Sequence, residues 1–203
     1  MKPDFSFERR AGGIVAGIDE AGRGPWAGPV VAAAVVLTPD IPDVLFKQID
    51  DSKKLSPRTR VNLYRQLNNY AEIGIGTASV NEIDDLNILR ATMLAMQRAV
   101  ADLPFIPETI LIDGNKTPEL PSPSKAIVNG DKLILSIAAA SIYAKVTRDK
   151  YMFSLSKEYD GYGWEQNSGY GTQRHQQGLI NCGITEHHRK SFRPVKNIIK
   201  QNT

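Results

Sequence analysis

Four carboxylates stand where this chain could do chemistry: Asp19, Glu20, Asp113 and Asp131 each end an apolar, strand-like run or come just before a helical pattern. A carboxylate at the buried edge of a sheet is costly unless a cation neutralises it. Carboxylate oxygens without neighbouring histidines or cysteines suit Mg²⁺ or Mn²⁺ better than zinc. Two such ions can clamp the attacking and leaving oxygens of an in-line phosphoryl displacement. The pattern therefore predicts a two-metal site.

Each carboxylate also has an ordinary structural interpretation. Asp113 with Gly114 could form a simple turn, and Asp131 could cap the following helix. Asp19 and Glu20 could be a solvated pair at a strand end. Taken singly, these interpretations are as good as the metal site, but together they need three independent coincidences. We therefore favour one shared metal site.

Asp19 and Glu20 raise a geometrical question, because neighbouring side chains of a regular strand point to opposite faces. Both reach one site only if the strand ends at Asp19 and Glu20 lies in the turn that follows. That turn contains Gly22, Arg23 and Gly24, which would let the backbone approach a ligand and offer N–H groups and a guanidinium to a phosphate. It is neither a Walker loop nor a full dinucleotide fingerprint. By itself this stretch is better explained as a tight turn. Its position beside the carboxylates strengthens the interpretation as a phosphate-binding loop.

Several other polar residues could contact an anion. Ser141, Lys145 and Arg148 are spaced i, i+4 and i+7, so they share one helix face. That face is either a solvated polar face or a phosphate-binding stripe. Lys53 and Lys54 leave the same two alternatives open.

Aromatic and imidazole side chains gather towards the C-terminus. Tyr170 lies between two glycines in a polar stretch, so its ring could stack on a sugar or a base. His175, His187 and His188 lack a metal-binding spacing, and we expect surface or phosphate-contact roles for them. Cys182, the single cysteine, is interpreted as a plain structural or surface thiol.

The elements that must position these residues follow from the apolar spacing. Continuous or period-2 apolar runs predict five strands, and helical spacing predicts three longer helices. The strands cover residues 14–19, 30–37, 72–79, 109–113 and 126–128, and the helices cover 57–70, 81–100 and 134–151. Ser56 followed by Pro57 marks the start of the first helix. This order predicts an α/β fold with a mixed five-stranded sheet and helices on both faces.

Composition sets the outer limits of the interpretation. The 203 residues, 41% of them apolar and 23% charged, suit one sizeable globular core. A net charge of +3 permits a nucleic-acid partner without requiring one. The sequence contains no apolar run near the ~20 residues of a membrane span and no leader-like start. We therefore expect a cytoplasmic protein with no membrane segment.

The composition changes after about residue 155, where glycine, tyrosine, glutamine and histidine become frequent. We predict that residues 1–155 form the main α/β unit and that 156–203 form a small C-terminal helical and loop extension.

Six motifs, in order from residue 14 to about 195, together resemble bacterial ribonuclease HII, the type 2 ribonuclease H family. They are IDEAGRGP at 18–25, DSKKLS at 51–56, IDGN at 112–115, GD at 130–131 followed by IAAASIYAKVTRD at 137–149, GYGT at 169–172 with His175, and HRKSF at 188–192. The first and fourth are long enough to be specific.

The resemblance implies a ribonuclease H-like fold and a role for each motif residue. By it, Asp19, Glu20, Asp113 and Asp131 would be the catalytic carboxylates and would bind two Mg²⁺ or Mn²⁺ ions. The backbone of Gly22, Arg23 and Gly24 would read a ribonucleotide's 2′-hydroxyl, Tyr170 would stack on the next sugar, and Lys53, Ser141 and Lys145 would hold backbone phosphates.

The same resemblance implies an activity. The enzyme would be an endoribonuclease that hydrolyses the RNA strand of RNA–DNA hybrids and nicks duplex DNA on the 5′ side of an embedded ribonucleotide. It would leave a 3′-hydroxyl and a 5′-phosphate, and would serve ribonucleotide excision and RNA primer removal. We expect a monomer whose 156–203 extension completes the substrate site.

Two residues depart from the family pattern. Trp26 stands where a smaller apolar residue is usual, which could shift packing behind the site. Ser168 stands where a lysine often precedes Gly-Tyr-Gly, which removes a possible phosphate contact. Two rival functions stay open: a nuclease or phosphotransferase with other substrate rules, and a non-catalytic hybrid-binding module. A mere binder has no use for carboxylates that repel phosphate.

Overall fold

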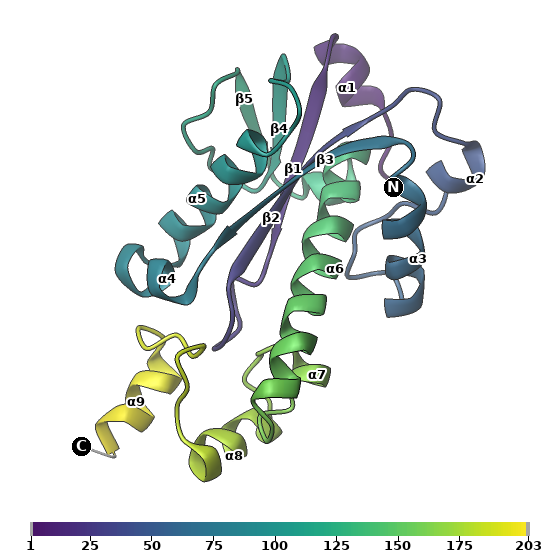
Figure 1. The fold of residues 1–203 in the computed structure, drawn as a ribbon. Coiled ribbons are helices and arrows are strands. Elements are labelled where there is room, and N and C mark those ends of the chain that lie inside the picture. Colours follow the sequence, from purple (N-terminus) through teal and green to yellow (C-terminus); the bar gives the residue numbers. More distant parts are fainter. Residues whose placement is uncertain (1, 202–203) are drawn as a thin grey trace.

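Five strands form one mixed sheet in the computed structural model, which describes residues 2–201 (Figure 1). In chain order they are β1 (Val15–Ala21), β2 (Val30–Leu37), β3 (Ala71–Ala78), β4 (Thr109–Asp113) and β5 (Ser124–Ile127). β2 pairs antiparallel with both β1 and β3. On the other side of β1, β4 pairs parallel with β1, and β5 pairs parallel with β4. The spatial order is β3-β2-β1-β4-β5. The predicted mixed five-stranded sheet is confirmed, although β5 begins before residue 126.

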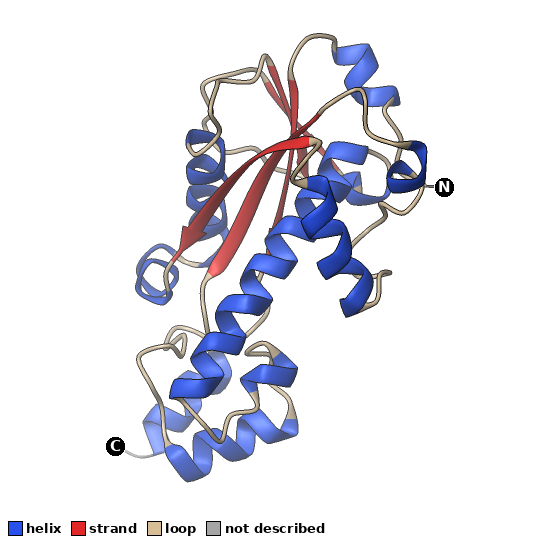
Figure 2. Cartoon of the chain, turned by 45° about the vertical axis from the view of Figure 1, so that its right-hand side comes forward, coloured by secondary structure: helices blue, strands red, loops and turns tan. Residues whose placement is uncertain are grey.

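Two long helices cover the two faces of this sheet (Figure 2). α5 (Ile88–Ala101) packs on one face and α6 (Leu135–Glu158) on the other. Because side chains alternate along a strand, Ala32 of β2 joins the apolar cluster beneath α5, whereas Ala33 joins the one beneath α6. The prediction of helices on both faces is confirmed.

Glycines in β3 let α5 approach the sheet closely. A Cβ built on Gly74 would lie 2.1 Å from the carbonyl oxygen of Ala99, and one on Gly76 would lie 2.0 Å from that of Ala95. Side chains at these two positions would push the helix away. The alternating glycines of this strand are therefore a packing requirement.

The single helix predicted over residues 81–100 is wrong, because the chain forms two. α4 (Val80–Leu86) and α5 are separated by Asn87, whose φ is +69°. Its side chain accepts hydrogen bonds from the N–H groups of Leu89 and Arg90 and so caps α5. The apolar spacing continues across this break, so periodicity alone did not reveal it.

The remaining helices are short. α3 (Pro57–Leu67) begins at the predicted residue, because the Ser56 hydroxyl accepts a hydrogen bond from the N–H of Thr59. The others are α1 (Ser6–Ala11), α2 (Asp43–Phe46), the 3₁₀ turn η1 (Gly130–Lys132), α7 (Trp164–Asn167), α8 (Gln173–Cys182) and α9 (Arg193–Gln201).

α6 links the sheet to the C-terminal part of the chain. It continues to Glu158 instead of ending near residue 151, and α7, α8 and α9 lie around its far end (Figure 2). Met152 and Leu155 of α6 pack there with Trp164 and Leu179 in a separate apolar cluster. The boundary after residue 155 falls within α6 and stays a prediction, and residues 202–203 lie outside the described part. Across residues 2–201, no helix is long and apolar enough to cross a membrane.

Candidate metal centre

Three aspartates from separate elements meet at one end of the sheet. One carboxylate oxygen from each of Asp19, Asp113 and Asp131 lies within 4.8 Å of the other two. Ile18 of β1 pairs with Ile112 of β4 in parallel register, so the next residues lie side by side. Asp113 is the last residue of β4, and Asp19 lies just before the end of β1. The N–H of Gly130 donates to Asp113 Oδ1 at 2.7 Å, which ties η1, and with it Asp131, to the end of β4.

Two of these three carboxylates are buried with little to balance their charge. Asp19 is 5% exposed and Asp131 is 3% exposed. Burial, together with the charges of Glu20 and Asp113, raises the pKa of Asp19 well above its usual value. Burial and the charge of Asp113 also raise the pKa of Asp131. The neighbouring cation is Lys53, whose Nζ lies 3.6 Å from Asp131 Oδ2 and whose side chain is 79% exposed.

The donor set therefore fits a hard divalent cation. Carboxylate oxygens are the ligands that Mg²⁺ and Mn²⁺ prefer, and a bound ion would stabilise the charged carboxylates that burial and mutual repulsion disfavour. The predicted convergence of Asp19, Asp113 and Asp131 is confirmed.

Glu20 lies in β1, so its predicted place in the turn is wrong. β1 continues to Ala21, and Glu20 pairs with Ala32 in the ladder. Its side chain therefore starts from the opposite pleat to Asp19, and it is not one of the three converging carboxylates. Glu20 Oε1 accepts a hydrogen bond of 3.0 Å from Arg23, while Oε2 is buried with no hydrogen-bond partner in the described residues. A buried acceptor left unpaired is suited to a cation, and the role of Glu20 as a ligand stays a prediction.

The residues predicted to contact substrate share one cavity of about 250 Å³ with three of the four carboxylates, and Asp131 is not part of its lining. Its lining includes Asp19, Glu20, Asp113, Gly22, Arg23, Gly24, Lys53, Ser141, Lys145 and Tyr170. Tyr170 is 48% exposed, and its ring lies 3.5 Å from where a Cβ on Gly24 would be. Residues from both ends of the chain therefore build one cleft.

Ser141 and Lys145 lie on α6 beside this cleft. The Ser141 hydroxyl donates to the carbonyl of Ala138 and accepts from the N–H of Ser52, so it also anchors the loop that carries Lys53. Lys145 pairs with Asp149 at 2.7 Å. Ser52 was not singled out by the sequence as a site residue, because its contact through a backbone N–H has no residue-type signature.

Arg148 does not belong to a phosphate-binding stripe or to a solvated face. It is 1% exposed, and its guanidinium donates to the carbonyls of Ala27, Pro29 and Ser168. Helical spacing placed Arg148 beside Lys145, but the C-terminal part covers that end of α6. Arg148 therefore links the backbone of the loop after β1 to the backbone at Ser168.

The expected surface roles of His175 and His188 are also wrong, because both side chains are fully buried. Their Nε2 atoms lie 3.1 Å apart, and the indole N–H of Trp164 donates to His175. Burial, with the charge of His175, lowers the pKa of His188 to about 3. Both imidazoles are thus neutral parts of the C-terminal core, while the thiol of Cys182 is exposed.

The two departures from the family pattern have local structural roles. The Trp26 ring fills the space beside Gly171, where a Cβ would lie 2.1 Å from it. Ser168 donates to Asp149 Oδ1 at 2.9 Å, and Asp149 in turn pairs with Lys145.

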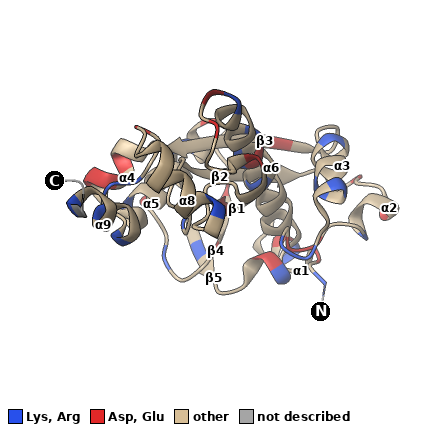
Figure 3. Ribbon diagram, turned by 90° about the horizontal axis from the view of Figure 1, so that it is seen from below, with Lys and Arg blue, Asp and Glu red and all other residues tan. Residues whose placement is uncertain are grey.

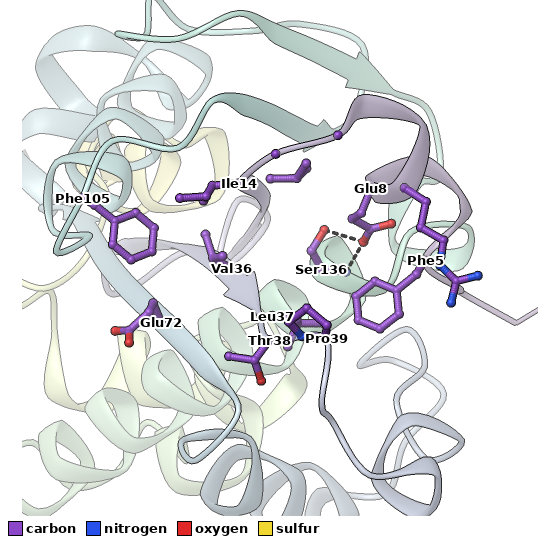
Figure 4. Close-up of a pocket in the computed structure, with 14 residues that line it drawn as sticks. Phe5, Glu8, Ile14, Val36, Leu37, Thr38, Pro39, Glu72, Phe105 and Ser136 are labelled. Atoms are coloured by element: carbon purple, nitrogen blue, oxygen red, sulfur yellow. Dashed lines mark hydrogen bonds between the residues drawn. The ribbon is translucent and has the colours of Figure 1, made fainter.

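A larger cavity of about 590 Å³ lies at the opposite end of β1 (Figure 4). Phe5, Ile14 and Phe105 line it, and Glu8 accepts hydrogen bonds there from the N–H and hydroxyl of Ser136. Its lining includes no residue predicted for the metal centre.

Comparison with known proteins decides the family. A family model described as ribonuclease HII matches residues 16–195. The chain belongs to the ribonuclease HII family. It is 52% identical over 200 residues to ribonuclease HII of Gluconobacter oxydans, which covers 98% of this chain and 97% of that protein. It is also 53% identical over 203 residues to ribonuclease HII of Rhodospirillum rubrum, and this alignment covers 98% of this chain and 93% of that protein.

Solved structures agree on the fold. Ribonuclease H2 from Pyrococcus horikoshii superposes with a TM-score of 0.78 at 26% identity, over 92% of this chain and 97% of that one. Bst-RNase HIII, crystallised in complex with Mn²⁺, superposes with a TM-score of 0.74 at 18% identity. This superposition covers 98% of this chain and 74% of that one. The predicted ribonuclease H-like fold is confirmed. As a ribonuclease HII with an acidic metal site, the chain is a metal-dependent endonuclease that cleaves RNA in RNA–DNA hybrids.

A metal bound by these aspartates should stabilise the fold. Mg²⁺ at ten times its dissociation constant should add about 1.4 kcal/mol to the free energy of unfolding, which raises the melting temperature by roughly 3–6 °C. Asp113→Asn can still accept the Gly130 hydrogen bond but removes a charged ligand, so its melting temperature should not respond. Asp85→Asn, at an exposed carboxylate, is the control and should respond like the unaltered protein. An equal response of Asp113→Asn would show that the ion binds elsewhere.

Proposed function

We propose that the enzyme cuts RNA–DNA hybrids and also nicks duplex DNA on the 5′ side of a single embedded ribonucleotide, leaving a 3′-hydroxyl and a 5′-phosphate. The observation that carries this proposal is the single cleft in which Asp19 and Asp113, two of the three converging aspartates, lie together with Gly22, Arg23, Gly24 and Tyr170. The carboxylates supply the cleavage chemistry, and the other residues recognise the nucleotide.

Asp19, Asp113 and Asp131 would hold Mg²⁺ or Mn²⁺, and Glu20 would complete the site for a second ion during catalysis. When bound, such ions activate water for attack on phosphorus and stabilise the departing 3′-oxygen. Asp19, Asp113 and Asp131 converge from β1, β4 and η1, so their oxygens lie together before an ion binds. Lys53, beside Asp131, is placed to neutralise charge on the phosphate that enters the cleft.

The loop after β1 is suited to reading a 2′-hydroxyl, the group that separates RNA from DNA. The backbone N–H groups of Arg23 and Gly24 have no hydrogen-bond partner among the described residues. A Cβ on Gly24 would meet only Tyr170, at the ordinary contact distance of 3.5 Å. The packing of the chain therefore does not require glycine at this position, and close approach of a substrate does.

The other cleft residues fit a nucleic-acid backbone. Half-exposed Tyr170 would stack on the sugar next to the ribonucleotide, and Lys145 and Ser141 would contact phosphates. In the view from below, Lys and Arg residues of α3 and α9 lie on either side of β1, where the outer parts of a duplex would pass (Figure 3).

We further infer that residues 156–203 complete the substrate site, since this part supplies Tyr170. The activity would serve ribonucleotide excision and RNA primer removal, in a monomer that works in the cytoplasm where DNA is replicated. A hybrid-binding module without catalysis fits less well, because unneutralised aspartates would repel the phosphate backbone.

The proposed function predicts a sharp difference between two duplexes. With Mg²⁺ or Mn²⁺, the enzyme should nick a duplex holding one ribonucleotide and leave the matched all-DNA duplex intact. Gel analysis of an end-labelled strand gives the position of the nick. Asp19→Asn should abolish cleavage while leaving hybrid binding largely unchanged. Cleavage of both duplexes or of neither, or normal turnover by Asp19→Asn, would contradict the proposal.

The glycine loop predicts a separation of stability from activity. Gly24→Ala should melt like the unaltered protein but lose about tenfold or more in kcat/KM on the single-ribonucleotide duplex, since the new methyl keeps the 2′-hydroxyl from the backbone. Gly22→Ala is the contrasting variant, because Gly22 has a φ of +97° and a Cβ there would lie 2.1 Å from Arg148 Nε. It should lose stability as well. Full activity of Gly24→Ala would refute the proposed contact.

A further inference from the structure

Arg189 lies beneath the loop that follows β1. It is fully buried, and its guanidinium donates only to backbone carbonyls. Nη2 donates to Gly22 at 2.6 Å, to Gly28 at 2.7 Å and to Pro29 at 3.2 Å, while Nη1 donates to Arg23 at 3.1 Å and Nε to Gly28 at 2.9 Å. A residue near the C-terminus thus holds both ends of the loop that lines the cleft.

Two of these bonds fix the direction of the free N–H groups. A trans peptide unit is planar, so its carbonyl and the N–H that follows point in opposite directions. The Gly22 carbonyl shares its plane with the N–H of Arg23, and the Arg23 carbonyl shares its plane with the N–H of Gly24. When Arg189 holds both carbonyls on the buried side, both N–H groups are turned away from it, and their residues line the cleft.

Burial of the Arg189 guanidinium among backbone carbonyls is not explained by a gain in stability. No carboxylate hydrogen-bonds the Arg189 guanidinium in the described residues, and Arg148 lies close by with the same charge. Burial and Arg148 lower the pKa of Arg189 to about 9. Burying an unpaired cation normally destabilises a fold, so a function for this contact is expected.

Neighbouring contacts hold Arg189 in place. Its own N–H donates to the carbonyl of Trp26 at 2.8 Å, and its guanidinium lies 5.0 Å from the centre of the Phe192 ring. On the outer side, Asp84 accepts hydrogen bonds from the N–H groups of Lys190 and Ser191 at 2.9 Å each. The segment is therefore clamped from both sides.

We propose that Arg189 is a positioning residue for ribonucleotide recognition: it aims the N–H groups of Arg23 and Gly24 at the 2′-hydroxyl and so sets the selectivity for RNA over DNA. This inference rests on the proposed function of the same cleft. It assigns to the C-terminal segment a part in selectivity through the backbone that it holds, in addition to the stacking by Tyr170.

Arg148 provides a matched control. It is equally buried and also donates only to backbone carbonyls, one of them that of Pro29, but it makes no hydrogen bond to the carbonyls of Gly22 or Arg23. A change at either arginine disturbs the same core. Only a change at Arg189 releases the two peptide units that carry the recognising N–H groups.

The test compares binding of two labelled duplexes, one with a single ribonucleotide and its all-DNA twin, by fluorescence polarisation with Mg²⁺ in an Asp19→Asn background. The parent should prefer the ribonucleotide duplex. Arg189→Lys cannot span the same carbonyls with a compact ammonium, so its preference should fall about tenfold, towards no discrimination. Arg148→Lys should keep the preference even if its melting temperature drops.

A preference retained by Arg189→Lys, or lost equally by Arg148→Lys, would overturn the inference. A parent that does not discriminate would instead show that the proposed ribonucleotide recognition is wrong, which is a separate failure. If Arg189→Lys does not fold, Asp84→Ala loosens the same segment from its outer side. It should lower the preference in part, and an unchanged preference there would contradict the positioning role.

Discussion

Repulsion among three converging aspartates, of which Asp19 and Asp131 are buried, governs the site. Asp19, Asp113 and Asp131 come from β1, β4 and η1, and burial together with the nearby charge of Asp113 raises the pKa of Asp19 and of Asp131. The parallel pairing of β1 with β4 and the hydrogen bond from Gly130 to Asp113 bring them together. The fold thus holds like charges close, and a bound divalent metal would relieve the repulsion.

The loop after β1 depends on a second electrostatic arrangement. Arg148 and Arg189 lie beneath it, and their guanidinium groups satisfy its carbonyls from the buried side. Carboxylates therefore face one side of the cleft, while arginines hold the backbone that faces the other. Because Arg189 comes from the segment after α8, we propose that the C-terminal part belongs to the recognition machinery as well as to the core around Trp164. In this proposal, cleavage and selectivity depend on residues far apart in the sequence.

The convergence of the three aspartates could be predicted from the sequence, because explaining their positions without a shared metal site requires separate coincidences. Predictions failed where tertiary contacts override a local pattern. Glu20 stays in β1 because the pairing with β2 continues past Asp19, with Glu20 opposite Ala32 and Ala21 opposite Val31. Asn87 breaks a helix whose apolar spacing is continuous. Arg148, His175 and His188 look like surface residues by type, yet the C-terminal part buries them. Burial of a polar residue is set by distant segments, which no local spacing reveals.

The central claim is that Asp19, Asp113 and Asp131 bind one metal centre, and metal-directed cleavage of the protein tests it most directly. Fe²⁺ replaces Mg²⁺ and, with ascorbate and peroxide, produces radicals that cut the backbone beside the ion. Mass spectrometry should find cuts near residues 19, 113 and 131, three positions remote in sequence, and excess Mg²⁺ should suppress all of them together. Cuts elsewhere, or cuts at these positions that Mg²⁺ does not suppress, would contradict the account.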